Sequence, residues 1–155
     1  MNFGDHSTTL LTFVSTVIIC FASALIPVIN IEVYVIFLGS VAPRPLLPAL
    51  LITATLSHMA GKSLMYLAAR GFERLPAGRL KDRVAAAKMK LEQRQSLGSA
   101  VVLVSAVTGI PPFYLTSVAA GALRFNFTSF FVMGFLGRLL RFAALIALPQ
   151  VARSS

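Results

Sequence analysis

Glu32 is the residue of this chain whose type and position point most directly to chemistry. Residues 7–31 contain no Asp, Glu, Lys or Arg, and the next charged residue after Glu32 is Arg44. A carboxylate in hydrocarbon is costly, so such a group usually faces a protein interior or a wet cavity and finds a partner. There it can pair with a base or exchange a proton. The alternative is a hydrated carboxylate near the membrane interface that takes no part in function.

Two arginines near the end of the chain are candidate partners for this acid. Arg138 and Arg141 are three residues apart, so on a helix they share one face. They can pair with Glu32 or bind a phosphate headgroup, because a guanidinium presents a planar fork of donors to such oxygens. The alternative is that both side chains extend their charged ends to a membrane interface.

A second pair of titratable residues, His58 and Lys62, is separated by about one helical turn. In a membrane span these groups can join a proton path, or Lys62 can extend to the interface instead. His6 and His58 are the only histidines and Cys20 is the only cysteine, so we expect no metal site and no cofactor. Signatures of metalloproteases, serine hydrolases and P-loop proteins are missing from the sequence. We therefore do not expect an enzyme.

These residues need elements to position them, and the sequence predicts two broken apolar stretches. One runs from about residue 8 to 38 and the other from 98 to 123. Proline supplies no backbone donor, and irregular backbone at membrane depth is tolerated only where it is buried in protein or lines a cavity. A plain turn at the interface is the alternative. The predicted breaks are at Pro27 and Asn30 in the first stretch and at Gly109, Pro111 and Pro112 in the second.

The composition indicates an integral membrane protein. The chain has 155 residues, of which 57% are hydrophobic and 12% charged, whereas soluble domains carry about 25% charged residues. Eight of the fourteen Lys and Arg residues fall between Arg70 and Arg94. Such clustering predicts a cytoplasmic loop by the positive-inside rule, and it argues against a nucleic-acid partner. Within the loop, residues 80–91 have the periodicity of a short amphipathic helix, although a solvated connector is an equal alternative.

The order of these stretches predicts an architecture. A broken segment followed by a spanning segment occurs twice, in residues 8–69 and 98–150, on either side of the basic loop 70–97. We therefore predict a single all-α integral membrane domain over residues 1–155. It consists of two inverted-repeat-like units, each a broken, re-entrant helical hairpin followed by a transmembrane helix. We expect a multi-pass protein of the inner (plasma) membrane.

Four motifs, in this order, resemble the DedA-like, or VTT-domain (SNARE-associated Golgi protein), family. They are residues 26–32 (IPVINIE), 61–71 (GKSLMYLAARG), 110–121 (IPPFYLTSVAAG) and 137–142 (GRLLRF). The likeness covers roughly residues 22–142, and the order and spacing of the motifs are more specific than any one of them. Many family members have an aspartate where this chain has Lys62. They also carry two arginines around the second proline element, where this chain has Thr108, Phe113 and Tyr114.

The resemblance implies a function in membrane lipid transport. Related proteins are linked to moving a phospholipid or a polyprenyl-phosphate carrier across the bilayer, and some to lipid scrambling. By position, Glu32 would take the acidic role, with Arg138 and Arg141 as transport or gating residues. The implied partners are membrane lipids, including anionic phospholipid or lipid phosphate, and the sequence leaves a homo-oligomer open. The alternatives are a non-transporting, membrane-organising protein that uses the basic loop, or an exporter of small solutes or drugs.

Overall fold

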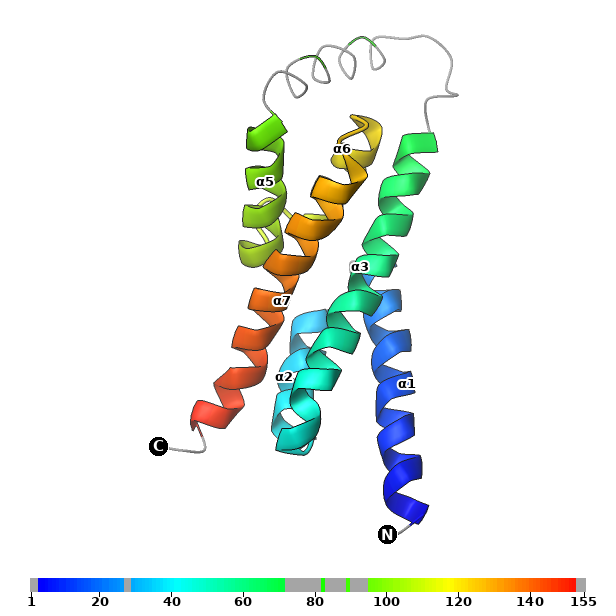
Figure 1. Cartoon of the computed structure of the whole chain (residues 1–155), viewed down its shortest axis with the longest axis vertical. Helices are drawn as coiled ribbons and strands as arrows, with labels where there is room; N and C mark the ends of the chain where they lie inside the picture. The colour runs from blue at the N-terminus through cyan, green and yellow to red at the C-terminus, as the bar shows by residue number, and fades with distance from the viewer. Residues whose placement is uncertain (1–2, 27–28, 72–81, 83–88, 90–94, 153–155) are drawn as a thin grey trace. The chain divides into compact units, whose positions relative to one another are not determined.

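The computed structural model describes residues 3–26, 29–71, 82, 89 and 95–152, and every regular element among them is a helix. The predicted all-α class is confirmed. Pro27 and most of residues 70–97, including the expected amphipathic helix, lie outside the described residues. In chain order the helices are α1 (Phe3–Leu25), α2 (Ile31–Val41), the 3₁₀ helix η1 (Arg44–Leu46), α3 (Leu47–Gly71), α5 (Gln95–Thr108), α6 (Phe113–Ala122) and α7 (Phe127–Ala152) (Figure 1).

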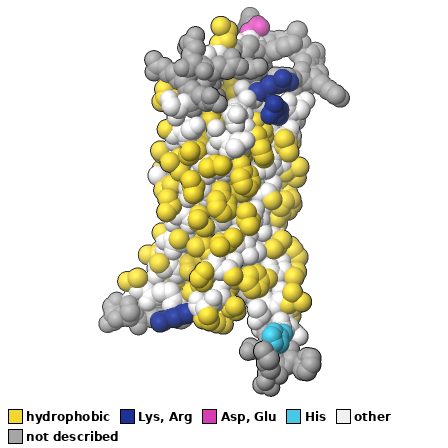
Figure 2. Space-filling model, viewed as in Figure 1, with side chains coloured by type: hydrophobic (Ala, Val, Ile, Leu, Met, Phe, Trp, Pro, Cys, Tyr) yellow, Lys and Arg dark blue, Asp and Glu magenta, His cyan; other side chains and the backbone are white. Residues whose placement is uncertain are grey.

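Two of the described helices are long and apolar enough to cross a bilayer. They are the segment His6–Leu25 of α1, with 20 residues, and the 26 residues of α7. About 20 residues at 1.5 Å per residue match the roughly 30 Å of a hydrocarbon core. α3 is as long, but it carries more polar side chains. Hydrophobic side chains cover most of the visible surface of the described residues, and few charged ones reach it (Figure 2).

The chain forms two compact units. The first contains residues 1–61 and 139–155, and the second contains residues 62–138. Because α3 and α7 each extend across a boundary, each long helix contributes to both units. The predicted division into residues 8–69, 70–97 and 98–150 follows chain order and stays a prediction.

The first unit has a core to which four helices contribute. Its buried members come from α1, α2, α3 and α7. Tyr34 of α2 and Thr16 of α1 are joined by a hydrogen bond of 3.0 Å between their hydroxyl oxygens. A Cβ atom on Gly39 would lie 2.7 Å from the carbonyl oxygen of Ile146, so α2 and α7 pack backbone to backbone there. The buried core residues are Cys20, Ile31, Val35, Ala54, Phe142 and Ile146.

The proline-rich connection before α3 is more helical than the sequence predicts. Residues 42–48 contain three prolines within six residues, a pattern that predicts a turn because proline does not fit a helix interior. Instead Pro45 lies in η1 and Pro48 lies in the first turn of α3. A proline is tolerated in a first turn because its missing N–H would have no partner within the helix there.

The second unit is built around the short helices α5 and α6, which pack against each other across the break 109–112 (Figure 1). The hydroxyls of Ser105 and Thr116 lie 2.9 Å apart between them. At its C-terminal end α6 closes with the two backbone bonds of a Schellman motif, from Arg124 N to Gly121 O and from Phe125 N to Ala120 O. Arg124, the first residue beyond the C-cap, accordingly has a positive φ of 54°.

Several Ser and Thr hydroxyl groups of the helices bond to their own helix. Seven of them donate to the carbonyl oxygen four residues earlier, at oxygen–oxygen distances of 2.7–3.0 Å. These polar groups therefore need no partner on a neighbouring helix. The residues are Thr12, Thr16, Ser40, Thr53, Thr55, Thr108 and Ser117.

Candidate functional site: an ion pair at the start of α2

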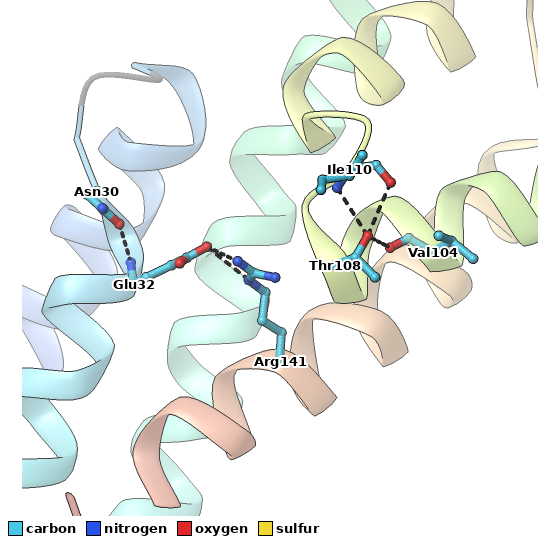
Figure 3. A network of polar contacts seen from close by, with 6 residues as sticks. All are labelled: Asn30, Glu32, Val104, Thr108, Ile110 and Arg141. Atoms are coloured by element: carbon cyan, nitrogen blue, oxygen red, sulfur yellow. Dashed lines mark hydrogen bonds and ion pairs between the residues drawn. The ribbon is translucent and has the colours of Figure 1, made fainter. Parts of the chain in front are cut away.

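Glu32 is placed by the start of α2. Asn30 is the N-cap residue of this helix, and its side-chain oxygen accepts a hydrogen bond of 3.0 Å from the backbone N–H of Glu32 (Figure 3). Asparagine is favoured at this position because it satisfies one of the unpaired N–H groups of the first turn. A carboxylate in that turn also interacts favourably with the positive end of the helix dipole. Asn30, predicted as a break, thus marks the beginning of α2.

Arg141 of α7 pairs with this carboxylate. Its Nε donates to Oε1 of Glu32 at 2.9 Å, and its Nη2 donates to the same oxygen (Figure 3). The Arg141 side chain is 20% exposed and that of Glu32 is 36% exposed. The pair is therefore shielded from water only in part. It joins α2 to α7 across 109 residues of sequence.

Two N–H groups of one guanidinium converge on a single carboxylate oxygen, and such charge-assisted bonds are stronger than neutral ones. Partial exposure leaves both side chains within reach of polar groups from outside. The ion pair holds α2 against α7, and it includes a guanidinium that is partly accessible from outside.

Arg138 has different surroundings, although the sequence grouped it with Arg141. Its side chain is 7% exposed, and its guanidinium carbon lies 4.7 Å from the centroid of the Phe113 ring, within the second unit. Three residues along a helix turn a side chain by about 300°, so two such side chains point about 60° apart. That offset is enough to give neighbouring arginines different contacts.

The second break has its backbone satisfied locally. Gly109 adopts a positive φ of 80°, which glycine permits without steric cost. The hydroxyl of Thr108 accepts a 3.1 Å hydrogen bond from the N–H of Ile110 (Figure 3). Ser105 donates to the carbonyl oxygen of Pro111 at 2.6 Å. The sequence reading missed these roles of Ser105 and Thr108. The presence of Ser105 and Thr108 just before Gly109 and two prolines could have indicated that their hydroxyl groups bond to the backbone of the break.

The family model of the VTT domain matches residues 26–149 of this chain. This range contains Glu32, Arg141 and both breaks. The chain belongs to the VTT-domain family. The resemblance seen in the sequence is thereby confirmed, and the protein is a member of a membrane family commonly linked to lipid and transport roles. No curated protein and no solved structure matched the chain.

Within this VTT domain, the proposed proton-path residues lie on α3 and are both buried. His58, in the first unit, contacts the ring of Phe142 edge-on, with 5.7 Å between ring centroids. Lys62, in the second unit, has its Nζ 3.8 Å from Sδ of Met65. Their role in proton transfer stays a prediction. No group of three or more His, Cys, Asp or Glu residues that could hold a metal ion occurs in the described part of the chain.

Another polar contact, which was not predicted from the sequence, is made by Gln150, one residue beyond the matched range. Gln150 of α7 donates to the carbonyl oxygen of Gly39, and Arg44 donates to the side-chain oxygen of Gln150 at 3.2 Å. The C-terminal end of α2 is therefore hydrogen-bonded to α7 through Gln150, and the N-terminal end is bonded to α7 through Arg141. The position of Gln150 after an apolar stretch could have indicated this second contact between α2 and α7.

Proposed function

We propose that this VTT-domain protein moves an amphiphilic lipid, a phospholipid or a polyprenyl phosphate, across the bilayer as a transporter or scramblase. No catalytic step is part of the proposal. The observation that carries it is the partly exposed ion pair of Glu32 and Arg141. Such a pair lies in a protein whose surface is otherwise largely apolar, where charges are costly and are kept for a function. The roles commonly linked to the family also support it.

The pair acts as a gate in this proposal. In the closed state it holds the start of α2 against α7. A headgroup phosphate competes with the carboxylate for the guanidinium, because both present oxygens to the same donors. As Arg141 binds the phosphate, Glu32 is released and α2 can move away from α7. The acyl chains remain in the bilayer, so only the polar headgroup needs a path through the protein.

The membrane arrangement is part of the same proposal. The pairs α1–α2 and α5–α6, each with a short break between helices, act as re-entrant hairpins of two inverted-repeat-like halves. The basic segment 70–97 lies in the cytoplasm, and the protein lies in the inner membrane. The length and apolar character of α7 and the two helix–break–helix pairs support this arrangement.

Reconstitution into liposomes tests the function. Phospholipid with a fluorescent headgroup is included in both leaflets, and a membrane-impermeant reductant then quenches the outer leaflet. We expect quenching to go beyond half of the signal only when protein is present. Glu32→Gln should change the rate by about tenfold, which corresponds to 1.36 kcal/mol at the barrier. Thr53→Ala, which removes an exposed hydroxyl bonded to its own helix, is the matched control and should leave the rate unchanged.

Two outcomes would contradict the proposal. Equal quenching with and without protein would exclude lipid transport, and equal rates for wild type and Glu32→Gln would exclude the gate.

The eight basic residues between Arg70 and Arg94 favour one alternative function, a membrane-organising protein that holds an anionic lipid or partner. Neutralising Arg79, Lys81, Arg83, Lys88 and Lys90 should abolish that role, whereas lipid transport should largely persist.

A further inference from the structure

The C-terminal end of α2 has a backbone carbonyl group that its own helix cannot satisfy. In a continuing α-helix the carbonyl oxygen of Gly39 would accept a hydrogen bond from the N–H of residue 43, but Pro43 has no N–H. Gly39 is buried, where an unpaired carbonyl group is costly. Gln150 of α7 supplies the missing donor, and Arg44 donates to the oxygen of the same amide at 3.2 Å. A glutamine fits this place because its amide is both a donor and an acceptor.

Two further features hold this end of α2 in place. Gly39 lies so close to α7 that an added Cβ atom would be 2.7 Å from the carbonyl oxygen of Ile146 and 3.1 Å from Cγ of Pro149. The connection that leads to α3 contains Pro43 and Pro45, and their rings fix φ near −65°. The connection therefore has few conformations. The C-terminal end of α2 is fixed to α7 by packing and a hydrogen bond, and to α3 by a stiff connection.

The N-terminal end of α2 is held in a different way. Asn30 caps the helix from its own chain segment, and the contact with α7 is the partly exposed ion pair of Glu32 and Arg141. In the proposed gate, an anion takes the place of Glu32 on the guanidinium. An anion cannot replace Gln150, because the carbonyl oxygen of Gly39 needs a donor. An anionic headgroup therefore releases only one of the two ends of α2.

We propose that Gln150 is a positioning residue of the gate, which keeps Gly39 against α7 so that α2 opens by pivoting about this point. This inference rests on the proposed function. Glu32 precedes Gly39 by seven residues, which is about 10 Å along the helix axis. A displacement of Glu32 by about 4 Å, which separates the two charges, needs a tilt of only about 20° over that length. Because the pivot end stays in contact, Glu32 returns to the same Arg141 when the gate closes.

Such a tilt is compatible with the other contacts of α2. The hydrogen bond between Tyr34 and Thr16 joins α2 to α1 rather than to α7, and it is kept when α1 and α2 move together. Ile31 and Val35 are buried in the core of the first unit. Lipid tails are as apolar as these side chains, so lipid can replace the contacts that a tilt opens. The tilt therefore breaks the ion pair and keeps the polar contacts at the other end.

Two distances between spin labels test the pivot in the whole chain, purified and reconstituted into liposomes. The labels are attached to cysteines introduced in a Cys20→Ala background. Val33→Cys with Leu140→Cys reports on the N-terminal end of α2, and Val41→Cys with Val151→Cys reports on the C-terminal end. These four side chains are 60–63% exposed, so the labels point away from the core.

Substitutions then release one end of α2 at a time. Glu32→Ala removes the acceptor of Arg141, and we expect it to lengthen the first distance by about 3–4 Å and to leave the second unchanged. Gln150→Leu, added to Glu32→Ala, should also lengthen and broaden the second distance, because Gly39 is released. Gln150→Glu keeps an acceptor for Arg44 but loses the donor to Gly39, so it should act as Gln150→Leu does. Thr53→Ala is the control and should change neither distance.

Each outcome decides the proposal. If Glu32→Ala lengthens both distances, α2 detaches rather than pivots, and the proposal is overturned. It is also overturned if Glu32→Ala lengthens neither distance, or if the second distance stays the same in both Gln150 variants. If Gln150→Leu fails to elute as folded protein on size exclusion, Gln150→Glu and the two distances in Glu32→Ala decide instead.

Lipid flipping by the unlabelled proteins separates this proposal from the proposed function. A pivot that depends on Gln150, found in a protein that does not flip lipid, would keep the positioning role and exclude transport. Flipping by a protein whose α2 does not pivot would keep transport and exclude the role of Gln150.

Discussion

Replacing Glu32 by glutamine, Arg141 by glutamine, and then both, measures how strongly the two side chains are coupled. Each single change leaves one charge without the partner seen at 2.9 Å in the structure. The double change removes both charges and leaves two neutral amide groups. If the pair stabilises the protein, the second substitution should cost much less in the background of the first than in wild type.

The size of the coupling follows from the exposure of the pair. Solvent-exposed ion pairs contribute about 0–1 kcal/mol, whereas removal of one partner from a buried pair costs about 3–5 kcal/mol. The Arg141 and Glu32 side chains are 20% and 36% exposed, which lies between these limits. Two guanidinium donors share one carboxylate oxygen, and this places the pair above the exposed class. We therefore expect a coupling free energy of about 1–3 kcal/mol, intermediate between the two classes.

Equilibrium unfolding in mixed micelles of a mild detergent and SDS provides the free energies of the four proteins. High salt should reduce the coupling only modestly, because partly buried charges are screened less than exposed ones. A parallel cycle that combines Arg141→Gln with Thr53→Ala is the control and should be additive. Additivity of Glu32→Gln and Arg141→Gln within about 0.5 kcal/mol would refute the reasoning, because independent sites add within that margin.

Three further substitutions, with Gly71→Ala as a control for the two other glycine variants, test the packing of each unit by thermal unfolding. Gly39→Ala should destabilise the first unit by about 1–3 kcal/mol, because a Cβ there would meet an α7 carbonyl oxygen at 2.7 Å. Gly121→Ala should destabilise the second unit by a similar amount of about 1–3 kcal/mol, because its Cβ would collide with the α3 backbone. Gly71→Ala is the control for both, with no atom within 4 Å of the added Cβ; equal losses in all three would contradict the packing. Tyr34→Phe should cost about 0.5–1.5 kcal/mol, since its hydroxyl bonds to that of Thr16, and no loss would contradict that bond.

The approximate ends of the helices were predictable because they depend on residues with strong local effects on the backbone. Apolar runs of helical length end at prolines or glycines, and those residues interrupt backbone hydrogen bonding whatever surrounds them. The break at Gly109 and the start of α7 after Asn126 follow from such local rules. The position of Pro48 inside α3 was mispredicted because a first turn tolerates what a helix interior does not.

The partners of the charged residues were less predictable, because they depend on how helices turn toward each other. Spacing showed that Arg138 and Arg141 share a face, but a rotation of tens of degrees decides which of them meets Glu32. A single sequence contains no direct signal for that angle.

The hydroxyl groups that bond to their own helices have a mechanical consequence. A helix that satisfies its own polar side chains leaves no broken hydrogen bond behind when it slides or rotates against a neighbour. Sliding then changes mainly van der Waals contacts, which re-form continuously along an apolar surface. The Glu32–Arg141 pair, the Thr16–Tyr34 hydrogen bond and the contacts of Gln150 instead join helices at single points. In the first unit, the resistance to helix movement is therefore concentrated in a few polar contacts, each of which can be removed by one substitution.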